Sequence, residues 1–305
     1  MKKILFATTA LVATTGMAAA DISFGGFGRF GLLYVEDAAE ETRVEQRFRL
    51  TVTGVTESDA GVKFEGRIRF QSDDQANGNS SVAHSSAPGF AVTSGSFRLD
   101  VGNVSNVADS GDAVNIYGYG VGMTGFVDNS SGQGMPASGF GTSAERNADG
   151  TEANTRAATV KLRYSAGDLT VAASYTDNDD EQVQLGVGYS FGDYSVGIMF
   201  ADEDTDDKEV VAASLGGEIG ALAFNLLIAD SDALDDTGYS LSVKYEMSAS
   251  TELRFAYSDG GDDDEEEAYG IGFIHQLGGG VSLRGGVGEN TDGDTVADLG
   301  VVFNF

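Results

Sequence analysis

The sequence lacks cysteine and tryptophan and has only two prolines and two histidines in 305 residues. Without cysteine the chain cannot use the disulfides that stabilise many exported β proteins. Basic residues are also few, 18 against 48 acidic ones, and the formal net charge of −30 argues against nucleic acid as a partner. The chain shows no 3.6-residue period and no apolar run long enough for a transmembrane helix. Together with 43 glycines, these absences indicate an all-β protein.

The first 20 residues have the parts of a secretory signal peptide in the right order. Lys2 and Lys3 precede an apolar run over about 4–17, and three alanines at 18–20 come directly before Asp21. The apolar run is too short, and too interrupted by threonine, to span a membrane as a helix. We therefore expect residues 1–20 to be removed from an exported chain that begins at Asp21.

From residue 21 to the end the chain repeats an alternating segment, a tight turn, a second alternating segment and a polar loop. Apolar and polar residues that alternate with a period of two are typical of strands with one apolar and one polar face. The region 88–102 fits two very short strands or one longer strand equally well. Counting two there, we expect sixteen strands, at residues 22–35, 43–56, 61–71, 88–94, 97–102, 158–165, 168–176, 182–191, 194–201, 208–218, 221–230, 237–246, 251–258, 267–277, 280–288 and 295–305.

The connections between these segments are of two kinds that alternate strictly. Short turns such as 192–193 and 247–250 are followed by long acidic stretches such as TDNDDE and DGGDDDEEE. Tyrosines and phenylalanines lie near the ends of the apolar faces, as in the aromatic girdles of membrane interfaces. Short turns on one rim and long loops on the other are typical of outer-membrane barrels. We predict a single domain over 21–305, a transmembrane antiparallel up-and-down β-barrel with its apolar face on lipid.

Three stretches carry a family resemblance: KLRYSAGDLTVAASYTD at 161–177, GYSFGDYSVGI at 188–198, and the closing VADLGVVFNF with its terminal Phe305. With these stretches the chain resembles the general diffusion porins of the Rhodobacter type, from alphaproteobacteria. The resemblance implies a trimer of sixteen-stranded barrels in the outer membrane of a Gram-negative bacterium. Such a porin passes small hydrophilic solutes and ions passively through a water-filled channel. A substrate-specific porin of the same fold, or an exported soluble calcium-binding β protein or adhesin, remains an alternative.

One connection, residues 103–157, contains no alternating segment. Irregular segments of more than roughly 15 residues are uncommon in compact proteins and are often functional. In porins the third loop folds into the barrel and narrows it, and the resemblance places this segment at that position. A disordered surface insertion is the alternative, which the apolar and aromatic content disfavours. We expect this constriction loop to present its acidic residues to the pore: Asp109, Asp112, Asp128, Glu145 and Asp149.

Positive charge gathers on one face of the first predicted strands. In RVEQRFRL at 43–50 and KFEGRIRF at 63–70, apolar residues share one parity and most basic residues share the other. If the apolar face lies on lipid, the basic face lies in the lumen, opposite the acidic loop. A solvated outer face of a soluble sheet is the alternative. We predict a basic pore wall made of Arg29, Arg43, Arg47, Arg49, Lys63, Arg67, Arg69 and Arg98.

The register of two strands follows from the turn that joins them. If the turn at 57–60 pairs the second strand with the third, Arg47 and Arg49 lie opposite or diagonal to Arg69 and Arg67. Like charges across a strand pair are destabilising, so stability alone does not explain this arrangement. A basic wall that faces acidic residues would instead set up a transverse field, which orders water and favours small hydrophilic solutes.

Four glycines lie on the outward parity of the same strands: Gly26, Gly28, Gly54 and Gly66. A glycine on a lipid face loses apolar contact, whereas at a subunit interface it allows two backbones to approach closely. General glycine richness of β-barrels explains them equally well. If the interface interpretation holds, the basic wall lies on the side of the pore that faces the trimer axis.

Little in the sequence indicates catalysis or a required cofactor. The two histidines, His84 and His275, lie in a polar loop and near a short turn, so we expect no enzymatic activity. Acidic stretches such as NTDGDT could offer oxygen ligands to Ca²⁺, but they lack the spacing of a calcium loop. The family implies calcium on the inserted loop, with no ligands assigned. Mg²⁺ or Ca²⁺ could also bridge the acidic loops to lipopolysaccharide.

Overall fold

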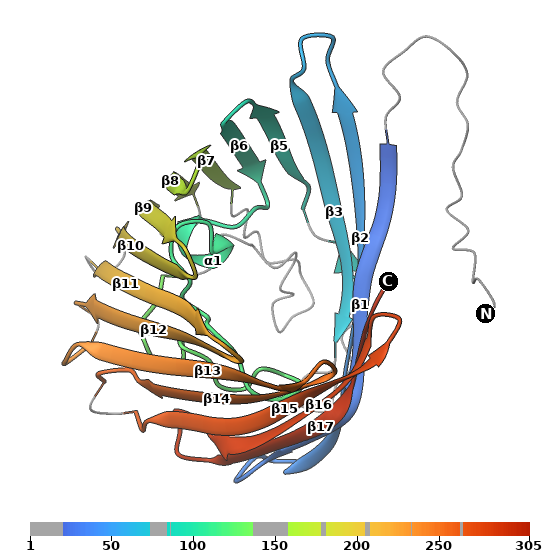
Figure 1. The fold of residues 1–305 in the computed structure, drawn as a ribbon, viewed down its shortest axis with the longest axis vertical. Coiled ribbons are helices and arrows are strands. Elements are labelled where there is room, and N and C mark those ends of the chain that lie inside the picture. The colour runs from blue at the N-terminus through green and yellow to red at the C-terminus, as the bar shows by residue number, and fades with distance from the viewer. Residues whose placement is uncertain are drawn as a thin grey trace, which may run out of the picture.

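The computed structural model describes residues 21–73, 84–85, 87–136, 158–177, 181–204, 208–232, 234–262 and 265–305. They form one antiparallel sheet that closes on itself, because β1 (Asp21–Val35) pairs with both β2 (Thr42–Glu57) and β17 (Thr295–Asn304). Figure 1 looks into the resulting ring. Within the described residues no helix is long and apolar enough to cross a membrane. The predicted signal peptide, 1–20, lies outside the described residues.

All sixteen predicted strands are present, and the region 88–102 forms two strands with a tight turn between them. A seventeenth strand, the two-residue β4 (His84–Ser85), was not predicted; it pairs with Phe70 and Gln71 of β3. The barrel is therefore built by sixteen strands, and each pairs with its neighbours around the ring. The remaining strands are β3 (Lys63–Asp73), β5 (Gly89–Ser94), β6 (Phe97–Gly102), β7 (Ala158–Ala166), β8 (Leu169–Asp177), β9 (Gln182–Phe191), β10 (Tyr194–Glu203), β11 (Lys208–Ile219), β12 (Leu222–Ser231), β13 (Gly238–Ser248), β14 (Thr251–Asp259), β15 (Ala268–Gly278) and β16 (Val281–Glu289).

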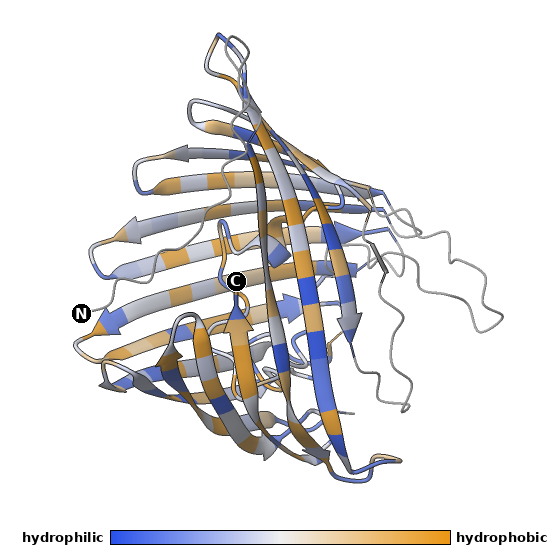
Figure 2. Ribbon diagram, turned by 90° about the vertical axis from the view of Figure 1, so that its right-hand side faces the viewer, coloured by the Kyte–Doolittle hydropathy of each residue, from blue (hydrophilic) through white to orange (hydrophobic). Residues whose placement is uncertain are grey.

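The two faces of the sheet follow the predicted parity. Leu185 and Ile228 point outward and are more than half exposed, whereas their chain neighbours Gln184 and Leu227 point inward and are fully buried. Figure 2 shows the same change of hydropathy from residue to residue along the strands. The apolar face on the outside is the arrangement that a lipid environment requires of a barrel.

The turn between β2 and β3 differs from the prediction, and the register of the two strands differs with it. The turn covers 58–62, because Glu57 pairs with Lys63. Arg47 therefore lies opposite Asp73 and Arg49 opposite Gln71, and only Arg49 has an arginine, Arg69, at a diagonal position on β3. This register places an acid or an amide of β3 opposite each of these two bases, which reduces repulsion between β2 and β3, although Arg47 lies directly opposite Arg29 on β1.

Two of the four outward glycines have a partner within the chain. Gly26 exchanges two backbone hydrogen bonds with Phe305, of 2.9 and 3.1 Å. The ring of Phe303 lies where a Cβ of Gly28 would point. These two glycines therefore make room for the closing strand, whereas the position of a Cβ on Gly54 is open.

Candidate functional site

Residues 103–136, the described part of the connection 103–157, lie inside the ring; we call them the inserted segment (Figure 1). The segment begins after Gly102, whose φ of +97° turns the chain away from β6, and forms the short helix α1 (Val107–Ser110) with Asn106 as its N-cap. Inward side chains of the barrel accept hydrogen bonds from its backbone. Ser174 accepts from the Val107 N–H (3.1 Å) and Ser242 from the Tyr119 N–H (2.8 Å).

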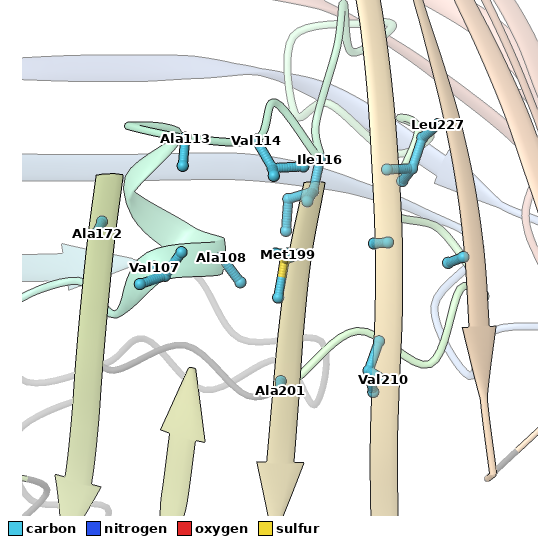
Figure 3. Close-up of a cluster of buried hydrophobic side chains, with 12 residues drawn as sticks. Val107, Ala108, Ala113, Val114, Ile116, Ala172, Met199, Ala201, Val210 and Leu227 are labelled. Carbon is cyan, nitrogen blue, oxygen red and sulfur yellow. The ribbon is translucent and has the colours of Figure 1, made fainter. Parts of the chain in front are cut away.

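Apolar side chains of the inserted segment pack on the inner face of the barrel. Val107, Val114 and Ile116 join a buried cluster with inward residues of β8, β10, β11 and β12, among them Met199 and Leu227 (Figure 3). Val121 and Val127 form a second cluster with residues of β14 and β15. We call the inward apolar residues and glycines of β8 to β15 that the segment covers the loop bed. The loop bed is covered by protein, although the sequence predicted a polar lumen at these positions, while inward bases of the same strands such as Lys244 and Arg254 stay partly exposed.

A signal for the loop bed was present in the sequence. Strands that are apolar on both parities, as in GIMFA at 197–201, VVAAS at 210–214 and LLIA at 226–229, are typical of sheets buried on both faces. Glycine is a second signal, because a Cβ on Gly188 of the loop bed would lie 2.5 Å from the carbonyl oxygen of Ala113. These inward glycines, not the outward ones, make the closest backbone approaches to the segment.

The tip of the inserted segment is clamped by three side chains of the barrel. Both carboxylate oxygens of Asp298, a nearly buried residue on β17, accept bonds from the backbone N–H groups of Met123 (2.9 Å) and Thr124 (2.8 Å), and the Thr124 hydroxyl donates a third bond (2.7 Å). Arg254 donates to the Gly120 carbonyl oxygen (3.0 Å). Arg29, predicted as a pore-lining base, donates to the carbonyl oxygen of Thr124 (3.5 Å).

Arg29 also forms an ion pair with a buried carboxylate. Its Nε donates to Glu45 over 2.6 Å, and Glu45 is only 4% exposed. Because both partners are nearly buried, this pair belongs to the structural support of the loop tip. The sequence interpretation missed Glu45, which lies 16 positions from Arg29, and Asp298, whose partners lie more than 170 positions away.

The inner faces of β2 and β3 carry six bases that we call the basic wall: Arg43, Arg47, Arg49, Lys63, Arg67 and Arg69. All six side chains point inward and none of the six residues is buried. Arg47 pairs with Asp73 at 3.1 Å, and the Nε of Arg49 donates to Gln71 over 2.6 Å. The last predicted base, Arg98, points inward on β6 and pairs with Glu65 (3.3 Å) and Asp100 (2.9 Å).

The predicted acids of the segment have three different placements. Asp109 accepts a bond from the Tyr117 hydroxyl (2.8 Å), and its charge is close enough to act on Arg69 of the basic wall. Asp128 accepts hydrogen bonds from the N–H and the hydroxyl of Ser130, and these bonds stabilise the turn in which Asp128 lies. Glu145 and Asp149 lie outside the described residues.

Asp112 is paired with bases that the sequence interpretation left out. It accepts from Lys161 of β7 at 2.8 Å and forms an ion pair with Arg163 of the same strand. Burial would by itself raise the pKa of Asp112, but the hydrogen bonds and charges of Lys161 and Arg163 outweigh it and lower the pKa. Asp112 therefore stays ionised and fixes the start of the segment to β7.

Every lysine and arginine of the described residues lies at an inward strand position. Parity alone would have found the bases outside the predicted set, which are Lys161, Arg163, Lys208, Lys244, Arg254 and Arg284. In the part of the chain that the structure describes, no group of three or more carboxylates and histidines could hold a metal ion. The site is thus an array of charges without a described metal centre.

Comparisons with known proteins agree with this arrangement. The sequence matches a family model described as Gram-negative porin over residues 7–295. It is 29% identical over 303 residues to a porin of Fuscovulum blasticum and 27% identical over 325 residues to a porin of Rhodobacter capsulatus; each match covers 93% of this chain and 100% of the relative. A solved structure of a Rhodopseudomonas blastica porin triple mutant is similar with a TM-score of 0.76 at 26% identity, over 93% of this chain and 100% of that chain.

Proposed function

The chain belongs to the Gram-negative porin family and forms a channel in the outer membrane, and from this premise we propose where its solutes pass. The passage lies between the basic wall on β2 and β3 and the inserted segment, which acts as the constriction loop. Small hydrophilic solutes and ions cross it by passive diffusion. The family match disfavours the alternative of an exported soluble calcium-binding protein.

One observation carries this proposal: the inserted segment covers one side of the lumen and leaves the basic wall partly exposed. Arg47 and Arg49 of the wall are partly exposed to the lumen, whereas Leu227 of the loop bed is fully buried. Asp109 belongs to the segment and acts electrostatically on Arg69 across the passage. Opposite charges on the two sides produce a transverse field, and walls of charge set the preference of a channel for ions.

A homotrimer is the assembly that the outward face of β1 to β3 supports. Gly54 and Gly66 leave a shallow outward groove of about 260 Å³ between their strands. Gln46 is exposed on the outward face of β2, and a polar amide is costly against lipid. A second copy of the chain on this face would cover both features and place the basic wall toward the trimer axis.

The remaining proposals concern export, the membrane surface and chemistry. Residues 1–20 act as a signal peptide, and the acidic loops contact lipopolysaccharide through bridging Mg²⁺ or Ca²⁺. Passive diffusion requires no cofactor, and calcium, if bound, would bind to the acidic loops. The chain has no catalytic role: His275 lies beside a short turn, where its Nδ1 is 2.8 Å from the Thr251 hydroxyl, and His84 lies in the two-residue β4.

Removal of the inserted segment tests the proposed passage. Deletion of residues 112–150 should raise the single-channel conductance in planar bilayers and the size limit for neutral sugars in liposome swelling. A matched control shortens the connection 37–40 on the long-loop rim, which should leave both values unchanged. An unchanged size limit in the 112–150 deletion would show that the segment does not narrow the channel.

A further inference from the structure

A polar cavity of about 340 Å³ lies between the inserted segment and the short-turn ends of β9 to β12. Its volume is in the range of small-molecule pockets. No lysine or arginine is among the described residues that line it. The polar side chains on its wall come from both the segment and the barrel, and they include Asn115, Ser190, Asp193, Ser195, Glu218 and Asn225. This cavity therefore differs in charge from the basic wall.

A glycine on β11 opens space in the cavity between two polar atoms. A Cβ on Gly216 would lie 2.9 Å from the Oγ of Ser195 and 3.6 Å from the Nδ2 of Asn225. The hydroxyl and the amide nitrogen therefore border the space that the missing side chain leaves. Ser195 is exposed, and within the described residues its hydroxyl makes no hydrogen bond.

Asn225 places an unpartnered donor on the cavity wall. The residue is only 2% exposed, and its Oδ1 accepts a hydrogen bond from the side chain of Asn129 over 2.8 Å, which fixes the orientation of the amide. In the part of the chain that the structure describes, the Nδ2 of Asn225 makes no hydrogen bond. Buried polar groups are normally hydrogen-bonded, so this donor indicates the place of an acceptor atom that comes from the solution.

Two exposed carboxylates line the same cavity. Asp193 lies in the turn between β9 and β10, and Glu218 lies near the end of β11. The Glu218 N–H donates to the Asp193 carbonyl oxygen over 3.0 Å, which keeps the two residues side by side. Among the described residues neither carboxylate accepts a hydrogen bond or forms an ion pair. Both are therefore available as acceptors for the hydroxyl groups of a solute.

The mixture of donors and acceptors decides between classes of solute. A hydroxyl group both donates and accepts, so a polyhydroxylated solute can use the amides, the serines and the carboxylates together. An anion would be repelled by the two carboxylates. A cation could use only the acceptors, and it would meet a like charge, because the Lys244 Nζ lies 5.7 Å from the centre of the Tyr119 ring and Tyr119 lines the cavity.

We propose that this cavity is a binding subsite for neutral polyhydroxylated solutes, of the class of monosaccharides. The solute accepts a hydrogen bond from Asn225 and donates to Glu218 or Asp193, with Ser195 between them. Such a subsite is compatible with conduction if binding is weak enough for the solute to leave. This inference rests on the proposed passage along the inserted segment and names one solute class that stops there.

The test is a titration of the single-channel KCl current in planar bilayers. The probes are D-glucose, triethylene glycol as a neutral solute of similar size with fewer hydroxyl groups, and putrescine as a small organic cation. We expect glucose to reduce the current along a saturation curve and triethylene glycol to reduce it in proportion to its concentration. Equal curves for glucose and triethylene glycol, or saturation by putrescine alone, would overturn the proposal.

Variants of the cavity locate the binding. Ser195→Ala should raise the half-saturating glucose concentration about 2- to 13-fold, the range for the loss of one hydrogen bond. Gly216→Ala puts a methyl group into the space between Ser195 and Asn225 and should abolish saturation; if this variant fails to fold, Ser195→Ala serves alone. The matched control is Ser23→Ala, at an inward and exposed position of β1 opposite Thr53, which should keep the wild-type curve. A Ser195→Ala channel with the wild-type curve would overturn the proposal.

Failure of the inference and failure of the proposed passage give different results. If the 112–150 deletion leaves the size limit for neutral sugars unchanged, the proposed passage fails. If that limit rises as expected but glucose reduces the wild-type current only in proportion to its concentration, the passage stands and only the subsite is wrong.

Discussion

The loop bed and the basic wall are two parts of one inner surface, yet they have opposite character. Inward residues of the loop bed such as Met199 and Ala212 are apolar and buried, and inward residues of the basic wall such as Arg47 and Arg67 are charged and partly exposed. Both sets occupy the same parity of their strands. The difference shows that an inward position in this barrel faces protein or water according to whether the inserted segment covers it.

The energetics of the two regions differ in the same way. Burying a side chain such as Leu227 or Met199 contributes about 1.5–3 kcal/mol, whereas a partly exposed ion pair such as Arg47–Asp73 contributes about 0–1 kcal/mol. The loop bed therefore contributes to stability, whereas the basic wall stays partly exposed to the lumen. Substitutions in the two regions should change different measurable quantities.

The largest expected effect is on ion selectivity, from the basic wall. Changing Arg47, Arg49, Arg67 and Arg69 together to serine removes four positive charges, among them the base that pairs with Asp73. We expect the ratio of K⁺ to Cl⁻ permeability to rise about tenfold, measured as the reversal potential in a KCl gradient.

The matched control for this prediction uses two bases on β7 that pair with a carboxylate of the inserted segment. Lys161→Ser with Arg163→Ser removes two bases that share the Asp112 carboxylate, so the reversal potential should shift much less. A fourfold arginine variant with the wild-type reversal potential would place the basic wall outside the permeation path.

A smaller effect is expected from releasing the loop tip. Asp298→Ala removes three hydrogen bonds to the tip, of which each charge-assisted bond contributes about 1.5–3 kcal/mol. The tip should then move, which increases the open-channel current noise while the mean selectivity stays close to the wild-type value. Asp100→Ala, on β6 away from the tip, is the control.

The absence of cysteine makes a direct version of this test possible. The Thr124 hydroxyl and the Asp298 carboxylate are 2.7 Å apart, so cysteines at positions 124 and 298 form a unique pair in this chain. Oxidation should lower the current noise of the double variant, and reductant should restore it. Current noise that does not depend on the redox state would show that Asp298 does not hold the loop tip in place.

The smallest effect concerns packing of the loop bed. Gly197 of β10 has no room for a Cβ, because the carbonyl oxygen of Ala113 occupies that position. Gly197→Leu should destabilise the protein by about 1–3 kcal/mol, as overpacking of a well-packed core does, seen as a lower midpoint of thermal unfolding by circular dichroism. Thr53→Leu, at an inward position beside Arg67 in the basic wall, should change the midpoint little. Equal midpoints of thermal unfolding in the two variants would mean that the segment does not pack closely against the loop bed.

Much of the fold was predictable because its signal is local. A period of two along ten residues assigns strand and faces without knowledge of the partner strand, so all sixteen barrel strands and the inward placement of the predicted bases were found. The family resemblance to Rhodobacter-type porins is confirmed by the family match and the related structures. Register was not local: the turn covers 58–62 rather than 57–60, which places Arg47 opposite Asp73.

The candidate site was predictable only in part, because its contacts join residues that are distant in the chain. Arg29 and Asp112 were predicted to line the pore, and the partners that they have in the inserted segment and on β7 were not predicted. Asp298 could not be assigned from the sequence, since its partners at 123 and 124 lie more than 170 positions away.

By itself, the sequence determined that sixteen strands would close into a barrel with apolar side chains outside and every described lysine and arginine inside, because alternation assigns each residue to a face. Only the tertiary structure decided which inward residues meet the solute. The inserted segment packs its apolar side chains on β8, β10 to β12, β14 and β15, where burial is favourable, and this packing leaves the charged inner faces of β2 and β3 partly exposed.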